Sequence, residues 1–241
     1  MCEVVNCHSQ PKERDMNGFM FFNQQESGER LADMIETMGL DLDGFKVVAV
    51  NQDGILVSHP IAKRFDLQVV PMVVAEFSAG QNGHYLTTTS FGDGLLHNGL
   101  DCCDGGAGSC LGVMNLQTML PALCEEVMSQ LFEQTMNLNL GRPVFAPARA
   151  LLVIDEVGDG YKLLAAIDAL RRNGTKEIIV VTPVAERWFC DVLDVGCIAL
   201  ASVFNWAGMP EDFTGWYASM PILPDQLAAF TVREFGASWA N

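Results

Sequence analysis

The stretch "LLVIDEVGDGYKLLAAIDALRRNGTKEIIVVTPVA", residues 151–185, decides the fold class. An apolar run at 150–154 leads into a loop that contains two glycines, and residues 162–173 then repeat apolar side chains at helical spacing. A second apolar run follows at 177–182. This order predicts a strand, a crossover helix and a second, parallel strand, which is the repeating unit of an α/β sheet.

The loop between the first strand and the helix has an unusual charge. Loops in this position usually bind a phosphate through backbone N–H groups, hydroxyl side chains and a nearby cation. Here the loop carries Asp155, Glu156 and Asp159, contains no Ser or Thr, and has Lys162 as its nearby cation. The loop therefore has the form of a phosphate site but the opposite charge.

The same alternation of apolar runs and helical patterns extends in both directions. The helix in "ESGERLADMIETMGL" is expected to start at Ser27 as N-cap and to stop at Gly39. The other elements expected in the α/β alternation are a strand at 46–50, a loop at 51–54, a helix at 55–65, a strand at 68–74, a helix at 184–193 and a strand at 195–201.

The middle of the chain departs from this alternation. Residues 84–97 alternate in type around a Gly-Asp-Gly turn, which predicts an antiparallel hairpin. A glycine-rich loop with three cysteines follows at 101–110, and a helical pattern runs from Val113 to about Leu138. The hairpin is therefore interpreted as an insertion into an α/β domain.

Composition restricts the classes of partner. The 241 residues suffice for a sizeable core, and 14 Lys and Arg against 30 Asp and Glu give a net charge of −16. That charge disfavours binding to nucleic acid and to anionic membranes. The N-terminal residues lack a secretory signal pattern, and the longest weakly polar stretch is shorter than the ~20 residues of a membrane span. We expect a cytoplasmic protein with no nucleic acid and no membrane partner.

The quoted stretch, together with "FFNQQESGERLADMIE", "KVVAVNQDGILVSHPIAKRFDLQVVPMVV" and "NWAGMPEDFTGWY", resembles the type I phosphoribosyltransferases, in particular their bacterial phosphoribosyltransferase-like branch. The resemblance covers residues 22–217. It implies a doubly wound parallel α/β sheet with a β-hairpin insertion. The corresponding organisation is an N-terminal extension at 1–21, a domain at 22–220 and a C-terminal tail at 221–241.

The chain departs from the family at three places that bind phosphoribosyl diphosphate. Where the family has an arginine-containing pyrophosphate turn, this sequence has Gln52 and Asp53, and Ala75 with Glu76 replace an Arg-Lys pair. The phosphate loop reads Gly-Asp-Gly-Tyr-Lys instead of a Thr-rich sequence. Each charge-assisted hydrogen bond lost removes about 1.5–3 kcal/mol, so we expect phosphoribosyl transfer, a glycosyltransferase reaction of nucleotide metabolism, to be lost or altered.

The resemblance also assigns roles by position. Asp155 and Glu156 would contact ribose hydroxyls or, if activity persists, a Mg²⁺ ion, and Trp206 would stack on a flat ring. A small nucleotide-like or polar ligand is expected at residues drawn from the acidic loop, the first strand end and this aromatic segment: Asp155, Glu156, Val157, Gly158, Asp159, Gly160, Tyr161, Gln52, Asp53 and Trp206. The alternative for the acids is a solvated turn that caps the next helix.

Two hypotheses from other classes stay open. Cys102, Cys103 and Cys110 share one loop and could form a redox disulfide or part of a metal site in a non-catalytic binding module. The paired Cys-x2-Cys spacing of a zinc site is missing, so ordinary loop thiols are the competing interpretation. The last hypothesis is a structural subunit of a homo-oligomer.

Overall fold

The computed structural model describes residues 19–78, 84–91, 94–98, 113–114, 145–157, 160–186, 194–203 and 215–217. The chain divides into two compact units. The first unit combines Met1–Val70, Ala148–Gly158 and Glu177–Leu223. The second combines Pro71–Pro147, Asp159–Lys176 and Pro224–Asn241. The division interleaves distant parts of the sequence, and each unit is described by itself.

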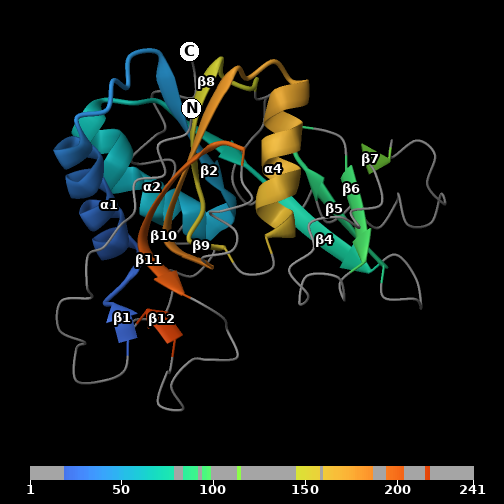
Figure 1. Ribbon diagram of the computed structural model, residues 1–241, viewed down its shortest axis with the longest axis horizontal. Coiled ribbons are helices and arrows are strands. Elements are labelled where there is room, and N and C mark those ends of the chain that lie inside the picture. Colours follow the sequence, from blue (N-terminus) through green and yellow to red (C-terminus); the bar gives the residue numbers. More distant parts are fainter. Residues whose placement is uncertain are drawn as a thin grey trace. The chain divides into compact units, whose positions relative to one another are not determined.

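The first unit is built on a parallel sheet of five strands in the order β11-β10-β8-β2-β3 (Figure 1). This arrangement confirms the predicted α/β fold class. A further short strand, β9, pairs with the end of β10. The strands are β2 (Phe45–Val50), β3 (Val69–Met72), β8 (Arg149–Val153), β9 (Glu156–Val157), β10 (Glu177–Glu186) and β11 (Gly196–Val203).

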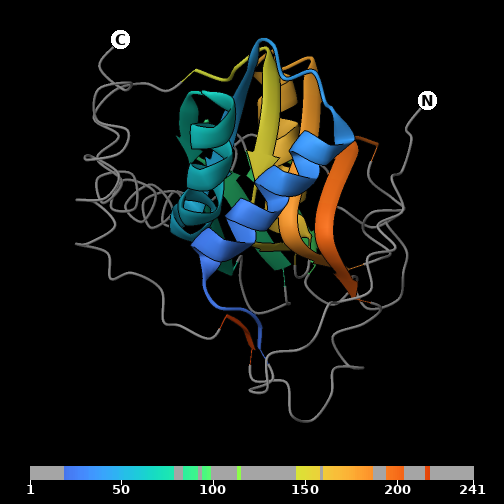
Figure 2. The same cartoon turned by 90° about the vertical axis from the view of Figure 1, so that its left-hand side faces the viewer.

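The central strands are buried and apolar over most of their length, with the charged residues Lys46, Arg149 and Glu177 near their beginnings. Val47, Val48, Leu151, Leu152 and Val180 each have 0% exposure. Helix α1 (Gln24–Met38) contacts β10 and β11, and α2 (Asn51–Phe65) contacts β2 and β8. The two helices also pack against each other, as the view along their side of the sheet shows (Figure 2).

Helix α1 begins earlier than the sequence predicted. The side chain of Asn23 accepts a hydrogen bond from the Glu26 N–H at 2.8 Å, so Asn23 is the N-cap. The prediction of Ser27 as N-cap is wrong, because this residue is buried in the first turn and its hydroxyl donates to the Gln24 carbonyl at 2.7 Å. The predicted end at Gly39 is confirmed by its left-handed conformation, φ 64°.

Helix α2 begins immediately after β2, so the predicted loop at 51–54 is wrong. Asn51 turns the chain by adopting φ 56°, a left-handed conformation that Asn tolerates better than most residues. Asp53 lies in the first turn, where a negative charge is favourable with the helix dipole. The polar residues that suggest a loop are thus residues suited to the start of a helix.

Arg149 links the beginning of β8 by hydrogen bonds to the beginning of β10 and to the turn that precedes β2. Its Nε donates to Glu177 Oε2 at 2.8 Å, and its Nη1 donates to the carbonyl oxygen of Asp43. The guanidinium carbon lies 4.2 Å from the centre of the Phe45 ring. The hydrogen bond to Glu177 raises the pKa of Arg149 above its ordinary value, so this group stays charged at every physiological pH.

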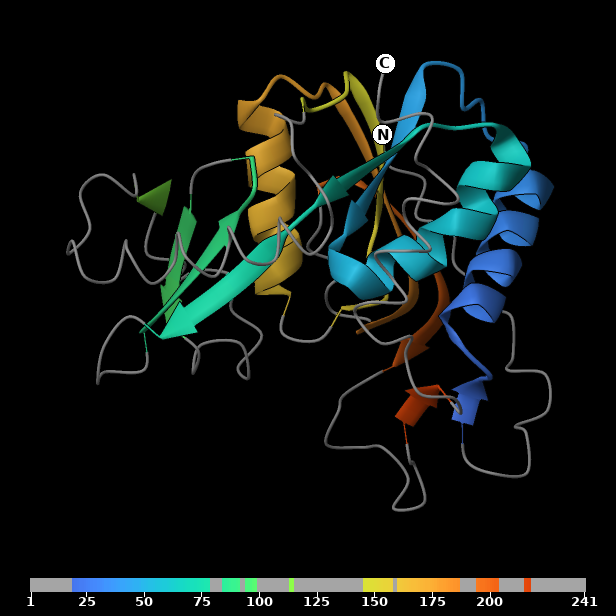
Figure 3. The same ribbon diagram turned by 180° about the vertical axis from the view of Figure 1, so that it is seen from behind.

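The second unit is an antiparallel sheet in the order β4-β5-β6-β7, with helix α4 (Tyr161–Arg172) in contact with its first three strands (Figure 3). The pairing of β5 with β6, for example Thr87 with Leu95, confirms the predicted hairpin. The strands are β4 (Val74–Ser78), β5 (His84–Thr89), β6 (Gly94–Asn98) and β7 (Val113–Met114).

Three other sequence predictions need correction. The strand predicted at 68–74 is two strands, β3 and β4, separated at Val73. The helix predicted from Val113 is wrong at its first two residues, which form β7, and residues 115–138 lie outside the described part. The helix predicted at 184–193 is wrong at 184–186, because β10 continues to Glu186 through its pairing with β11, and residues 187–193 lie outside the described part. Among the described residues, no helix is long and apolar enough to cross a membrane.

Candidate functional site

The strand order of the first unit reverses between β2 and β8. From β2 the chain continues to β3 on one side, whereas from β8 it continues to β10 and then β11 on the other. In open α/β sheets, ligands bind at such a reversal, beyond the carboxyl ends of the two strands. The residues that follow β2 and β8 are therefore the candidates for a binding site.

The register of the two strands brings these residues to the same level. Ala49 pairs with Val153, so Asn51 and Asp155 each follow two residues after paired positions, just beyond the ends of neighbouring strands. The first turn of α2 also touches the end of β8, since a Cβ atom added to Gly54 would lie 2.9 Å from the Val153 carbonyl oxygen. Gln52 and Asp53, both half-buried, belong to that turn. The predicted residues Gln52, Asp53 and Asp155 thus share one edge of the sheet.

Asp155 lies at a break in the strand ladder, and Pro183 explains the break. Val153 pairs with Val181 and Glu156 with Val184, so Asp155 is level with Pro183, which has no N–H to donate. The Ile154 N–H still donates to the Val181 carbonyl at 3.1 Å. Beyond the break the main chain of Glu156 and Val157 pairs again as β9. The interruption leaves the acidic residue on a bend at the edge of the sheet.

A second pair of chain segments reaches this bend. Strand β1 (Phe19–Phe21) pairs in parallel with β12 (Gly215–Tyr217), off the edge of the sheet at which its strands end (Figures 1 and 3). The Tyr217 hydroxyl donates to the Asp155 carbonyl oxygen at 3.3 Å. The rings of Phe21 and Tyr217 have centroids 5.9 Å apart and planes tilted by 36°.

Tyr217 is a contact at this bend that was not among the site residues expected from the sequence. The C-terminal aromatic segment drew attention to Trp206, which lies outside the described residues. The signal for Tyr217 was present in the Gly-Trp-Tyr sequence at the end of the segment that resembles the family. The sequence does not show which of Trp206, Trp216 and Tyr217 lies at the strand end.

The other predicted site residues fall into three groups. Gly160, with φ 78°, and Tyr161, which is buried, form the start of α4 in the second unit. Lys162 follows them as an exposed residue of α4. The remaining residues lie outside the described part of the chain: Gly158, Asp159, Cys102, Cys103 and Cys110.

Ala75 and Glu76, at which the resemblance leads one to expect cations, lie in β4 of the second unit. Ala75 is buried in β4, and the adjacent Glu76 accepts a hydrogen bond from the Thr87 hydroxyl at 3.3 Å. Across the described ranges, no group of three or more His, Cys, Asp or Glu side chains could hold a metal ion. At the candidate edge of the first unit, the carboxylates of Asp53 and Asp155 are groups that accept hydrogen bonds.

Comparisons with known proteins bear on the fold. No family model and no curated protein sequence matches the chain. Among solved structures, TT1426 from Thermus thermophilus is similar with a TM-score of 0.56 at 19% identity, over 88% of this chain and 98% of that one. This likeness shows a shared fold.

Two further solved structures are more distant. The purine phosphoribosyltransferase from Pyrococcus horikoshii has a TM-score of 0.40 at 12% identity, over 75% of this chain and 83% of that one. A hypothetical protein from Neisseria gonorrhoeae with bound ppGpp has a TM-score of 0.43 at 9% identity, over 90% of this chain and 99% of that one. Likenesses at this level assign no ligand and no activity to this chain.

Proposed function

We propose that this chain binds an uncharged, nucleoside-like small molecule through its hydroxyl groups at the edge formed by Gln52, Asp53 and Asp155, and that standard phosphoribosyl transfer is lost. The observation that carries the proposal is the reversal of strand order between β2 and β8, with an acidic residue following each strand. The strand-order reversal is a position at which ligands bind, and the negative charge of Asp53 and Asp155 determines which kind of ligand is favoured.

Carboxylates are suited to hydroxyl groups, because an ionised carboxylate only accepts hydrogen bonds and has two oxygens to do so. Two adjacent hydroxyls of a sugar can donate to such a group. A phosphate is itself an acceptor with negative charge, so it gains nothing from Asp53 or Asp155 and is repelled by both. The net charge of −16 adds to that repulsion.

The N-terminus of α2 is the feature that could favour a phosphate, and Asp53 opposes it. The first N–H groups of a helix and its dipole attract an anion with about half a unit of positive charge. Asp53 places a full negative charge in that same turn. The balance therefore favours a neutral ligand.

Mg²⁺, which the resemblance to phosphoribosyltransferases implies, fits the described residues poorly. Asp53 and Asp155 are carboxylates of the right type, but the described residues provide no cluster of three ligands. A bound Mg²⁺ would have to rely on water and on oxygens of a ligand. We assign the metal no step in this proposal.

The proposal is tested by calorimetric titration of the full chain with four probes. Adenosine carries two adjacent ribose hydroxyls, 2′-deoxyadenosine lacks one, and ribose 5-phosphate and phosphoribosyl diphosphate with Mg²⁺ carry phosphate. We expect adenosine to bind, and 2′-deoxyadenosine to bind about ten-fold more weakly because one hydrogen bond to a charged group is lost. Both phosphorylated probes should bind less tightly than adenosine.

Two single substitutions test whether adenosine binds at the edge formed by Gln52, Asp53 and Asp155. Asp155→Asn should weaken adenosine binding about ten-fold, since the amide is a poorer acceptor than the carboxylate. The matched control is Glu29→Gln, which removes one negative charge from the exposed side of α1. Tighter binding of phosphoribosyl diphosphate than of adenosine by the wild type would overturn the proposal. Equal effects of the two substitutions would mean that the ligand binds elsewhere.

A further inference from the structure

We propose that Tyr217 is a positioning residue, which fixes the main chain at Asp155 through its hydroxyl and is itself held in place by the first turn of α1. The inference rests on the proposed function only where it concerns a ligand. The mechanical part, that Tyr217 holds the bend after β8, rests on contacts within the first unit.

The bend at Asp155 receives a hydrogen bond from outside the sheet. The last pair between β2 and β8 is Ala49 with Val153, and after it the chain of β2 turns into α2. On the other side, Pro183 has no N–H to return to the Ile154 carbonyl, so the pairing with β10 is interrupted just before Asp155. Tyr217 supplies a donor to the Asp155 carbonyl from a third direction. Main-chain polar groups inside proteins are nearly always hydrogen-bonded, and this contact serves that need.

The strand pair that carries Tyr217 is too short to be stable alone. Strands β1 and β12 have three residues each, and an isolated two-stranded pair is marginal even when it is longer and antiparallel. Side-chain contacts must therefore hold it. Phe21 is 4% exposed, which makes its ring the buried anchor of the pair against Tyr217.

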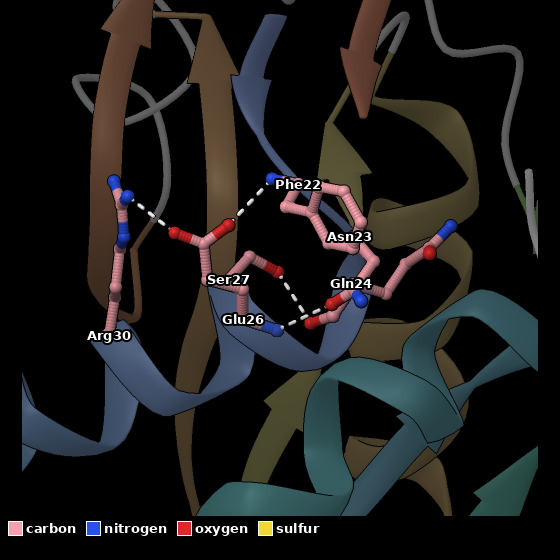
Figure 4. Close-up of polar contacts among 6 residues, drawn as sticks. All are labelled: Phe22, Asn23, Gln24, Glu26, Ser27 and Arg30. Carbon is pink, nitrogen blue, oxygen red and sulfur yellow. Dashed lines mark hydrogen bonds and ion pairs between the residues drawn. The ribbon is translucent and has the colours of Figure 1, made fainter. Parts of the chain in front are cut away.

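Residues near the start of α1 hold the segment that follows β1, as the polar contacts of Phe22, Glu26 and Arg30 show (Figure 4). One oxygen of Glu26 accepts a hydrogen bond from the Phe22 N–H at 2.6 Å, and the other oxygen accepts from Arg30 at 2.5 Å. The guanidinium of Arg30 lies 5.5 Å from the centre of the Phe21 ring. A continuous series of contacts thus runs from Glu26 through Phe21 and Tyr217 to Asp155.

Through these contacts, β1 and β12, the first and last described strands, both act on the candidate site. The hydroxyl of Tyr217 sets the position of the peptide that follows Asp155, and hence of the carboxylate proposed to accept hydrogen bonds. A positioning role predicts that removal of the hydroxyl loosens the bend and weakens ligand binding by a similar factor. Loss of overall stability should be small, because the ring and its contact with Phe21 remain.

The experiment measures hydrogen exchange of the Glu156 and Val157 amides by NMR in the full chain, for the wild type, Tyr217→Phe and Phe21→Leu. Loss of one hydrogen bond should speed this exchange about two- to ten-fold in Tyr217→Phe. Phe21→Leu keeps the hydroxyl but removes the ring contact, and should also speed it. The control is Thr37→Val, which removes a hydroxyl that donates to the Asp33 carbonyl at the far end of α1, and should leave both amides unchanged.

Unchanged exchange at Glu156 and Val157 in Tyr217→Phe overturns the inference, whatever the chain binds. A second readout is the affinity for adenosine, which should fall by about the same factor as the exchange rises. Faster exchange with unchanged affinity overturns the role of Tyr217 toward the ligand. If the wild type binds no adenosine, the proposed function fails, and the exchange rates still decide whether Tyr217 holds the bend.

Discussion

Gly54 is the residue on which the approach of α2 to β8 depends. An added Cβ atom would lie 2.9 Å from the Val153 carbonyl oxygen, which is main chain and part of the sheet. Alanine inside a helix is otherwise preferred to glycine by about 0.5–1 kcal/mol. Overpacking against a rigid neighbour costs about 1–3 kcal/mol, so the steric effect exceeds the gain.

We therefore expect Gly54→Ala to lower the free energy of unfolding by about 1–2 kcal/mol, measured by urea denaturation. The control is Gly196→Ala in β11, where the added atom would meet the Ile179 side chain at 3.5 Å, an ordinary contact. That variant should differ from the wild type by less than about 0.5 kcal/mol. Equal stability of Gly54→Ala and the wild type would show that α2 can move away from β8 at no cost.

At the scale of elements, Gly28 determines how closely α1 and α2 pack. A Cβ atom added at this position in α1 would lie 2.2 Å from the Val57 carbonyl oxygen and 3.1 Å from Cγ of Pro60, both in α2. Such an overlap with main chain cannot be relieved by a side-chain rotation. The two helices would have to separate along their contact.

Gly28→Ala should consequently destabilise the fold by about 3 kcal/mol, at the upper end for overpacking, and lower the midpoint of thermal unfolding. Gln25→Ala serves as the control, because this residue is exposed on the same helix and alanine is a good helix former. If Gly28→Ala were as stable as Gln25→Ala, the close contact between the two helices would not contribute to the fold.

The same elements show what the sequence could predict. Helical and strand periodicity located α1, α2, β8, α4 and β11 within a few residues, because continuous burial imposes those patterns. Several errors lie at the ends of elements, and others are residues predicted as helix that form strands. Residues 51–54 look like a turn, yet they form the first turn of α2, in which Gly54 lies against Val153. Such contacts join residues about a hundred positions apart, and local patterns do not contain them.

Some residues of the candidate site could be predicted from the sequence, and others require the structure. Asp155, Gln52 and Asp53 could be predicted, since charged residues after buried strands stand out. Their common level follows from the pairing of Ala49 with Val153, which requires the sheet. Tyr217 depends on a pairing between the two ends of the described chain, and the sequence contains no signal for that partner.

For the whole molecule, the net charge of −16 sets a dependence of stability on salt. Excess like charge destabilises a compact state by self-repulsion, and salt screens it. Salt also weakens attractive pairs such as Arg172 with Asp168, but exposed pairs contribute only about 0–1 kcal/mol each. Because acidic groups outnumber basic ones by 30 to 14, the screened repulsion should dominate.

The midpoint of thermal unfolding at pH 7 should therefore rise by a few degrees, about 3–6 °C, between about 10 mM and about 300 mM NaCl, as the Debye length falls from about 30 Å to below 10 Å. KCl should give the same rise, because screening depends on ionic strength and not on the cation. At about pH 5, closer to the isoelectric point of 4.4, the net charge is smaller and the salt effect should shrink. A fall in the midpoint with salt at pH 7 would mean that ion pairs, such as those of Arg64 with Asp33 and Glu36, outweigh the repulsion.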